Sequence, residues 1–114
     1  MNRYSRSHLG DQELLRQLAA TVAREHTATA ELLADLAEVD GRRLYLPQGF
    51  PSMYEYCLRV LHLSEDAAFK RIRAARAARE FPAIFEAVAR GRLHLSGVVT
   101  LAPHLTPENA QELL

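Results

Sequence analysis

The sequence predicts an all-α protein with one long N-terminal helix, followed by a compact cluster of short helices that contains a helix-turn-helix-like pair. Three observations predict this fold. The chain has 114 residues, which is the size of one ordinary domain. Its composition of 48% hydrophobic and 25% charged residues is typical of a folded chain. Strong helix formers dominate, and the five Gly and five Pro mostly fall between segments of helical periodicity.

The composition excludes several classes of protein. A single cysteine, Cys57, excludes an internal disulfide and a cysteine-rich zinc site. The polar first residues do not resemble a signal peptide, and no apolar stretch reaches the length of a membrane span. We therefore expect a cytoplasmic protein without membrane contact. We expect no metal or cofactor, because no histidine has a second metal ligand three or four residues further along an evident helix; the histidines are His8, His26, His62, His94 and His104.

The first predicted element is a long amphipathic helix over residues 11–43, preceded by a flexible tail over residues 1–10. Asp11 and Glu13 suit the positive end of a helix dipole. Apolar residues then recur at helical spacing as far as Val39. A break near residues 26–27 is the alternative, because only threonines and small apolar residues occur there.

Residues 44–51 are predicted to form a loop, since two prolines and a glycine interrupt the pattern. We expect the large apolar side chains of this loop to be buried rather than exposed. These residues are Leu44, Tyr45, Leu46 and Phe50.

The remaining residues, 52–114, are predicted to form the helical domain. Ser52 and Ser64 are N-caps for helices over residues 53–61 and 65–81, and together residues 52–81 have the outline of a helix-turn-helix. Pro82 either ends the second of these helices or begins the next.

Three short helices are predicted after Pro82. The first covers residues 83–90 and ends before Gly91. Ser96 is expected to cap a helix over residues 97–101. Thr106 is expected to cap a last helix over residues 107–114, with a proline in its first turn.

Five cations lie within ten residues of the second helix of the pair, and they are the candidate DNA-binding residues. Cations and small residues together are what a helix needs to enter the major groove of DNA. The alternative is a solvated structural helix, in which acids precede cations as the helix dipole favours and some cations pair with acids. The five residues are Lys70, Arg71, Arg73, Arg76 and Arg79.

The long helix is the candidate dimer interface. Residues 11–40 contain seven acids and two arginines, a net charge of −5, and an apolar stripe. Pairing with a second copy would cover this stripe, whereas the alternative is packing along the other helices of the same chain. The predicted interface residues are Leu14, Leu18, Val22, Leu32 and Leu36.

The zero net charge is a sum of unlike parts. It comprises +2 in residues 1–10, −5 in residues 11–40 and +3 in residues 41–114. The balance argues against a protein that coats nucleic acid indiscriminately, but it leaves room for a local basic surface. It also allows the acidic helix and the basic cluster to pack against each other.

Seven segments of the sequence together carry a family resemblance. They are LLADLAEVD (32–40), RRLY (42–45), YEYC (54–57), LSEDAA (63–68), RIRAAR (71–76), GRLHLS (91–96) and LAPHLTPEN (101–109). The chain resembles, over about residues 9–114, the N-terminal, non-nuclease region of bacterial HNH endonuclease-like proteins of the myxobacterial and delta-proteobacterial type. The resemblance implies a targeting or assembly domain, or a stand-alone relative that has lost the nuclease.

The nuclease motif of that family lies beyond this region and is absent from the sequence, so no catalytic residue is carried over and we expect no enzyme in this chain. Whether a nuclease domain follows in a longer parent protein stays open. The predicted function is DNA association as a homodimer. The alternative is a protein-interaction or regulatory module that uses the long acidic helix.

Overall fold

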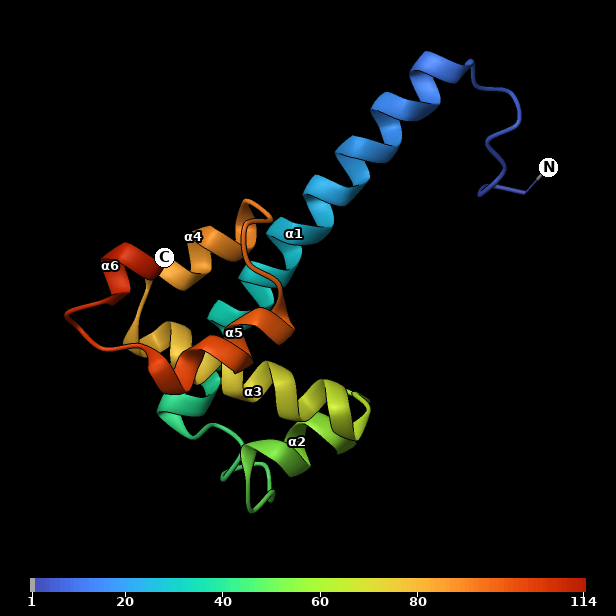
Figure 1. The fold of residues 1–114 in the computed structure, drawn as a ribbon. Coiled ribbons are helices and arrows are strands. Elements are labelled where there is room, and N and C mark those ends of the chain that lie inside the picture. The colour runs from blue at the N-terminus through green and yellow to red at the C-terminus, as the bar shows by residue number, and fades with distance from the viewer. Residues whose placement is uncertain (1) are drawn as a thin grey trace.

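The computed structural model describes residues 2–114, which form one long helix with a cluster of short helices packed around one half of it (Figure 1). No strand occurs among the described residues, so the prediction of an all-α fold with a long N-terminal helix and a cluster of short helices is confirmed. The elements are α1 (Asp11–Arg42), α2 (Met53–Arg59), α3 (Glu65–Glu80), α4 (Ala83–Ala89), α5 (Leu95–Leu101), a 3-10 turn η1 (Ala102–His104) and α6 (Ala110–Leu113).

Helix α1 is continuous, and the alternative of a break near residues 26–27 is wrong. The hydroxyl groups of Thr27 and Thr29 donate to the carbonyls of Ala23 and Glu25, at 3.1 and 2.9 Å. These threonines therefore satisfy their side chains within the helix rather than interrupting it. The helix ends at Arg43, whose left-handed backbone (φ 54°) is of the kind that terminates helices.

Two of the predicted caps hold as expected. Ser52 accepts a hydrogen bond from the backbone N–H of Glu55, and Ser64 accepts one from that of Ala67, each at 3.1 Å. At the start of α2 and of α3, the serine hydroxyl therefore accepts from a backbone N–H of the first turn, which has no acceptor within the helix. Pro82 lies between α3 and α4, as the residue immediately before α4.

The C-terminal helices differ from the prediction. Helix α5 begins at Leu95, with His94 before it, so Ser96 lies inside the helix and is not its cap. Helix α6 is shorter than residues 107–114. Thr106 still caps this segment, because its hydroxyl accepts from the Asn109 N–H while the Asn109 side chain accepts from the Thr106 N–H.

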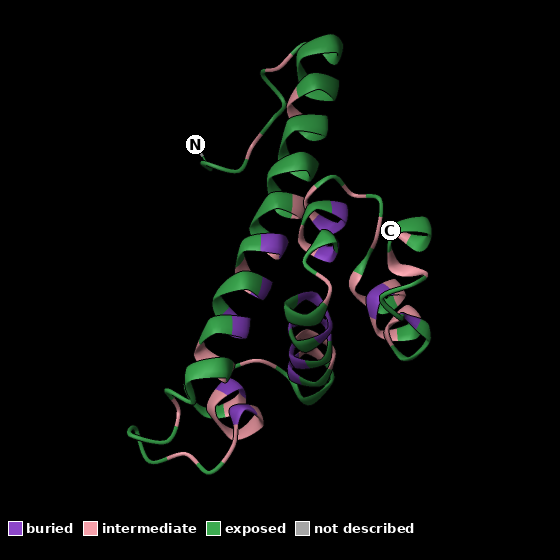
Figure 2. Ribbon diagram, turned by 90° about the vertical axis from the view of Figure 1, so that its left-hand side faces the viewer, coloured by how far each residue is buried: buried purple, intermediate pink, exposed green. Residues whose placement is uncertain are grey.

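Helix α3 lies at the centre of the cluster and packs against α1, α2, α4 and α5. Its inward positions are mostly alanine, which lets neighbouring helices approach closely. Burial is concentrated in the second half of α1 and in the helices that face it (Figure 2). The buried residues of α3 are Ala68, Ile72, Ala74, Ala75, Ala77 and Ala78.

The loop over residues 44–51 is only partly packed. Leu44 and Leu46 are 43% and 49% exposed, so the prediction that they are buried is wrong. Tyr45 and Phe50 are half-buried, and the Phe50 ring meets the Tyr56 ring edge-on at 5.7 Å. Aromatic contact with α2 therefore anchors the loop, while its leucines face outward.

Cys57 provides a test of this core. The residue is fully buried on α2. Burial, with a smaller contribution from the charge of Asp40, raises the pKa of its thiol. Because the thiolate is the reactive form, a disulfide reagent should modify Cys57 slowly in the native protein and rapidly in denaturant. Equal rates in the two states would contradict the packing of α2 described above.

Candidate interaction surfaces

The first surface is the half of α1 that extends beyond the cluster, residues 11–29, called here the projecting half of α1 (Figures 1 and 2). It contains no buried residue. Its large apolar side chains face solvent: Leu14 is 39% exposed, Leu15 60%, Leu18 58% and Val22 44%. Neighbouring apolar side chains left in water on one stretch of helix are typical of an interaction surface.

This exposed stripe continues the face that packs in the core. Eighteen residues make five helical turns, so Leu15 and Leu33 lie at the same angle on α1, as do Leu18 and Leu36. Leu33 and Leu36 are buried, at 0% and 4% exposure. One apolar face is therefore covered along its second half and uncovered along its first.

The predicted dimer residues are divided by this boundary. Leu14, Leu18 and Val22 are exposed, whereas Leu36 belongs to the core of its own chain and Leu32 packs against that core. Leu32 and Leu36 are therefore not available to a second copy. For this part of α1 the alternative holds, in which the helix packs along the other helices of its chain.

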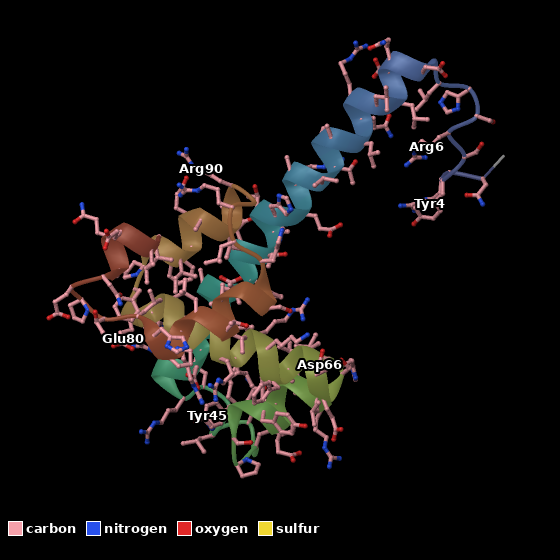
Figure 3. All side chains as sticks on the ribbon, in the orientation of Figure 1. Tyr4, Arg6, Tyr45, Asp66, Glu80 and Arg90 are labelled. Atoms are coloured by element: carbon pink, nitrogen blue, oxygen red, sulfur yellow. The ribbon has the colours of Figure 1, made fainter. Side chains whose placement is uncertain are left out.

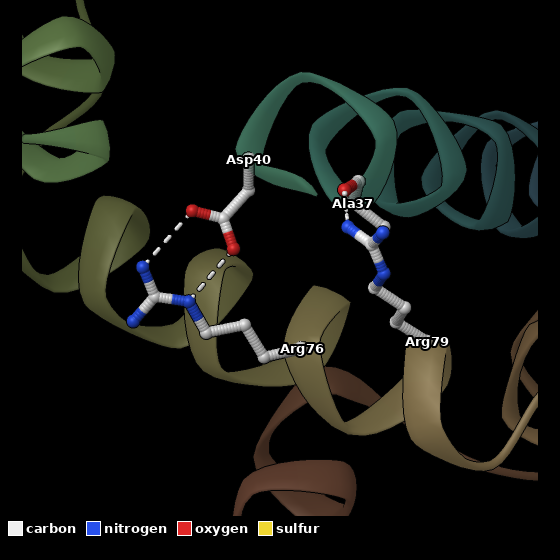
Figure 4. Close-up of polar contacts among 4 residues, drawn as sticks. All are labelled: Ala37, Asp40, Arg76 and Arg79. Carbon is white, nitrogen blue, oxygen red and sulfur yellow. Dashed lines mark hydrogen bonds and ion pairs between the residues drawn. The ribbon is translucent and has the colours of Figure 1, made fainter. Parts of the chain in front are cut away.

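The second surface concerns the cations of α3, and Arg76 is the one most firmly engaged (Figure 4). Its Nε and Nη2 donate to the two carboxylate oxygens of Asp40, at 2.8 and 3.0 Å. The Asp40 side chain is only 14% exposed, and its hydrogen bond with Arg76 raises the pKa of that guanidinium. This two-pronged ion pair joins α3 to the end of α1.

Arg79 makes a second connection to α1. Its Nη1 donates to the backbone carbonyl of Ala37, at 3.0 Å (Figure 4). The guanidinium occupies the space beside Gly41, where a Cβ atom would overlap it. Gly41 therefore makes room for the contact between Arg79 and α1, and its signal in the sequence is a glycine placed inside an otherwise regular helix.

The other three cations lie on different sides of α3. Arg71 comes four residues before buried Ala75, so it lies on the inward side of the helix. Lys70 pairs with Asp66 at 3.2 Å, and the Arg73 guanidinium lies 5.4 Å from the ring centre of Phe69, which is 50% exposed. We call Phe69, Lys70 and Arg73 the exposed edge of α3.

The five predicted DNA contacts therefore do not form one surface. Two of them bind α1, one lies on the inward side of α3, and two remain at the exposed edge. Figure 3 shows the acids Asp66 and Glu80 near opposite ends of α3, on either side of these cations. The contact of Arg76 with Asp40 follows the alternative in which the acidic helix and the basic cluster pack against each other.

Comparison of the chain with protein-family models, with curated proteins and with solved structures gives no match. Within residues 2–114, no helix has the length and apolar character needed to cross a membrane. The same residues contain no group of three or more His, Cys, Asp or Glu side chains that could hold a metal ion.

The Asp40–Arg76 pair makes a testable contribution to stability. A double-mutant cycle with Asp40→Asn and Arg76→Gln should give a coupling free energy of about 1 kcal/mol, because the carboxylate is largely covered and both oxygens are bonded. Chemical denaturation of the four proteins measures it. The matched control is the exposed pair Glu86–Arg90 on α4, expected at about 0.3–0.5 kcal/mol. Equal couplings for the two pairs would contradict the structural role given to Arg76.

Proposed function

We propose that this chain is a helical assembly module that joins two copies through the projecting half of α1. The single observation that carries the proposal is the exposure of Leu14, Leu15, Leu18 and Val22 on a helix that is packed only along its other half. A second copy brings the same apolar stripe, so two such helices cover each other.

The charges of the projecting half favour an antiparallel pair. Asp11 and Glu13 lie in the first turn of α1, whereas Arg24 lies near the cluster. Arg24 donates to the Thr21 hydroxyl, at 2.9 Å, rather than to a carboxylate of its own helix. A parallel pair brings the two acidic first turns together, whereas an antiparallel pair separates them and places each near both Arg24 and Glu25 of the other copy.

An antiparallel pair also keeps the two clusters apart, at opposite ends of a two-helix stem. Such an assembly role fits the resemblance to the accessory region of HNH endonuclease-like proteins, which itself stays a prediction. We place the assembly in the cytoplasm, in keeping with the lone, reduced and buried cysteine.

Self-association is tested by light scattering over a range of protein concentrations. The wild-type chain should change from monomer to dimer as concentration rises. Leu18→Glu should remain monomeric, because it places two buried charges at the centre of the stripe. Ala20→Glu, on the opposite, exposed side of the same helix, should still dimerise. A wild-type chain that is monomeric at high micromolar concentration would falsify the proposal and favour a different protein partner.

DNA association through the exposed edge of α3 is a second candidate. The observation that favours it is that Arg73 stacks on exposed Phe69 and is engaged with no carboxylate among the described residues, while Lys70 has only a solvent-exposed partner. Such a pair is weak in water and can exchange its acid for a phosphate. In this arrangement two cations per chain contact phosphate, whereas the sequence predicts five DNA-contacting residues.

The salt dependence of duplex binding tests this candidate. Two phosphate contacts per chain predict that log K falls with log salt at a slope of about −1.8. The double variant Lys70→Glu/Arg73→Glu should lose binding. Arg90→Glu/Arg92→Glu changes the net charge equally on another part of the surface and should bind more tightly than the first variant. Equal affinities for the two double variants, or no binding at low salt, would exclude this candidate.

A further inference from the structure

A pocket of about 460 Å³ lies between the middle of α1, helix α4 and the segment that leads into α5. It is separate from the exposed edge of α3, and its α1 residues Glu25 and His26 lie beyond Val22, the last residue of the exposed apolar stripe. Basic and hydroxyl side chains line it together with an apolar wall. Its lining includes Glu25, His26, Arg71, Val88, Leu93 and His94.

Arg71 is the unusual member of this lining. Its Nε atom is buried, and it has no hydrogen-bond partner among the described residues. The two other α3 arginines that face α1 are different, since Arg76 and Arg79 each donate to an acceptor of the protein. Arg71 therefore brings to the pocket a guanidinium whose charge no carboxylate of the described residues pairs, unlike that of Arg76.

Two histidines from different elements meet at the same pocket. The rings of His26 on α1 and His94 before α5 are 6.0 Å apart. The turn after α4 makes room for the first ring, because Gly91 has a left-handed backbone (φ 74°) and a Cβ atom there would lie 2.6 Å from His26 Nδ1. An imidazole ring carries at least one N–H donor in either protonation state.

From this donor set we propose that the pocket binds a small molecule that carries a phosphate group. The planar guanidinium of Arg71 matches the geometry of phosphate oxygens, and the imidazoles of His26 and His94 supply further donors. The side chains of Val88 and Leu93 form an apolar wall for the rest of the ligand. Glu25, an exposed acid of the lining, opposes the anion and limits its affinity.

The experiment is an NMR titration of the full chain with inorganic phosphate, at constant pH and ionic strength, with chloride as the balancing anion. The ring resonances of His26 and His94 should shift saturably with phosphate. Arg71→Gln should weaken binding at least ten-fold, while Glu25→Gln should tighten it several-fold. Arg59→Gln, which replaces an exposed arginine of α2, should leave the affinity unchanged and serves as the control.

Three results would overturn the proposal: no saturable shift in the wild-type chain, equal affinity in Arg71→Gln, or no gain in Glu25→Gln. The last variant replaces an exposed side chain, so the test does not depend on whether Arg71→Gln folds. A parallel titration with a short DNA duplex tests whether the phosphate comes from a small molecule or from DNA. If the duplex shifts both histidines and free phosphate does not, the pocket serves DNA and the small-molecule proposal is wrong.

Discussion

The packing of α3 against the second half of α1 is the contact on which the rest of the structure depends. Alanines at the inward positions of α3 let the two helices approach closely, and α2, α4 and α5 then pack around α3. Polar contacts fix this arrangement at its edge, since Asp40 binds Arg76 and the Ala37 carbonyl accepts from Arg79. A glycine at position 41 leaves the space that Arg79 occupies. Small side chains therefore fill the contact between α1 and α3, and the long side chains of Arg76 and Arg79 fix how the two helices lie against each other.

The five cations of α3 have different surroundings in the folded chain, although the net charge of the sequence is zero. A concentration of five cations on one helix resembles a nucleic-acid surface when the sequence is considered alone. In the folded chain, two of these cations bind the acidic helix and Arg71 lies beside a pocket, so each has a different environment. The charges that remain free for a partner are fewer, and they lie at one edge of α3 beside an exposed aromatic ring.

Local chemistry explains which parts of the fold were predictable. The starts of α2 and α3 follow from Ser52 and Ser64, because a cap depends on only three neighbouring residues. Which apolar residues of α1 are exposed was not predictable in this way. Leu15 and Leu33 occupy equivalent positions on the helix, and Leu33 is buried only because the short helices pack against that part of α1. The partner of Arg76 lies 36 residues away, and the pocket beside Arg71 is built by four separate segments, so neither has a signal in sequence spacing.

The unbroken course of α1 through residues 26–27 has a mechanical consequence. A helix of the length of the projecting half, at a rise of about 1.5 Å per residue, is a stiff rod of nearly 30 Å without a hinge. If two copies join along this rod, the rod acts as a ruler that sets the spacing between their clusters. The same unbroken helix also contains Asp40, so the projecting half and the ion pair with α3 belong to one rigid element.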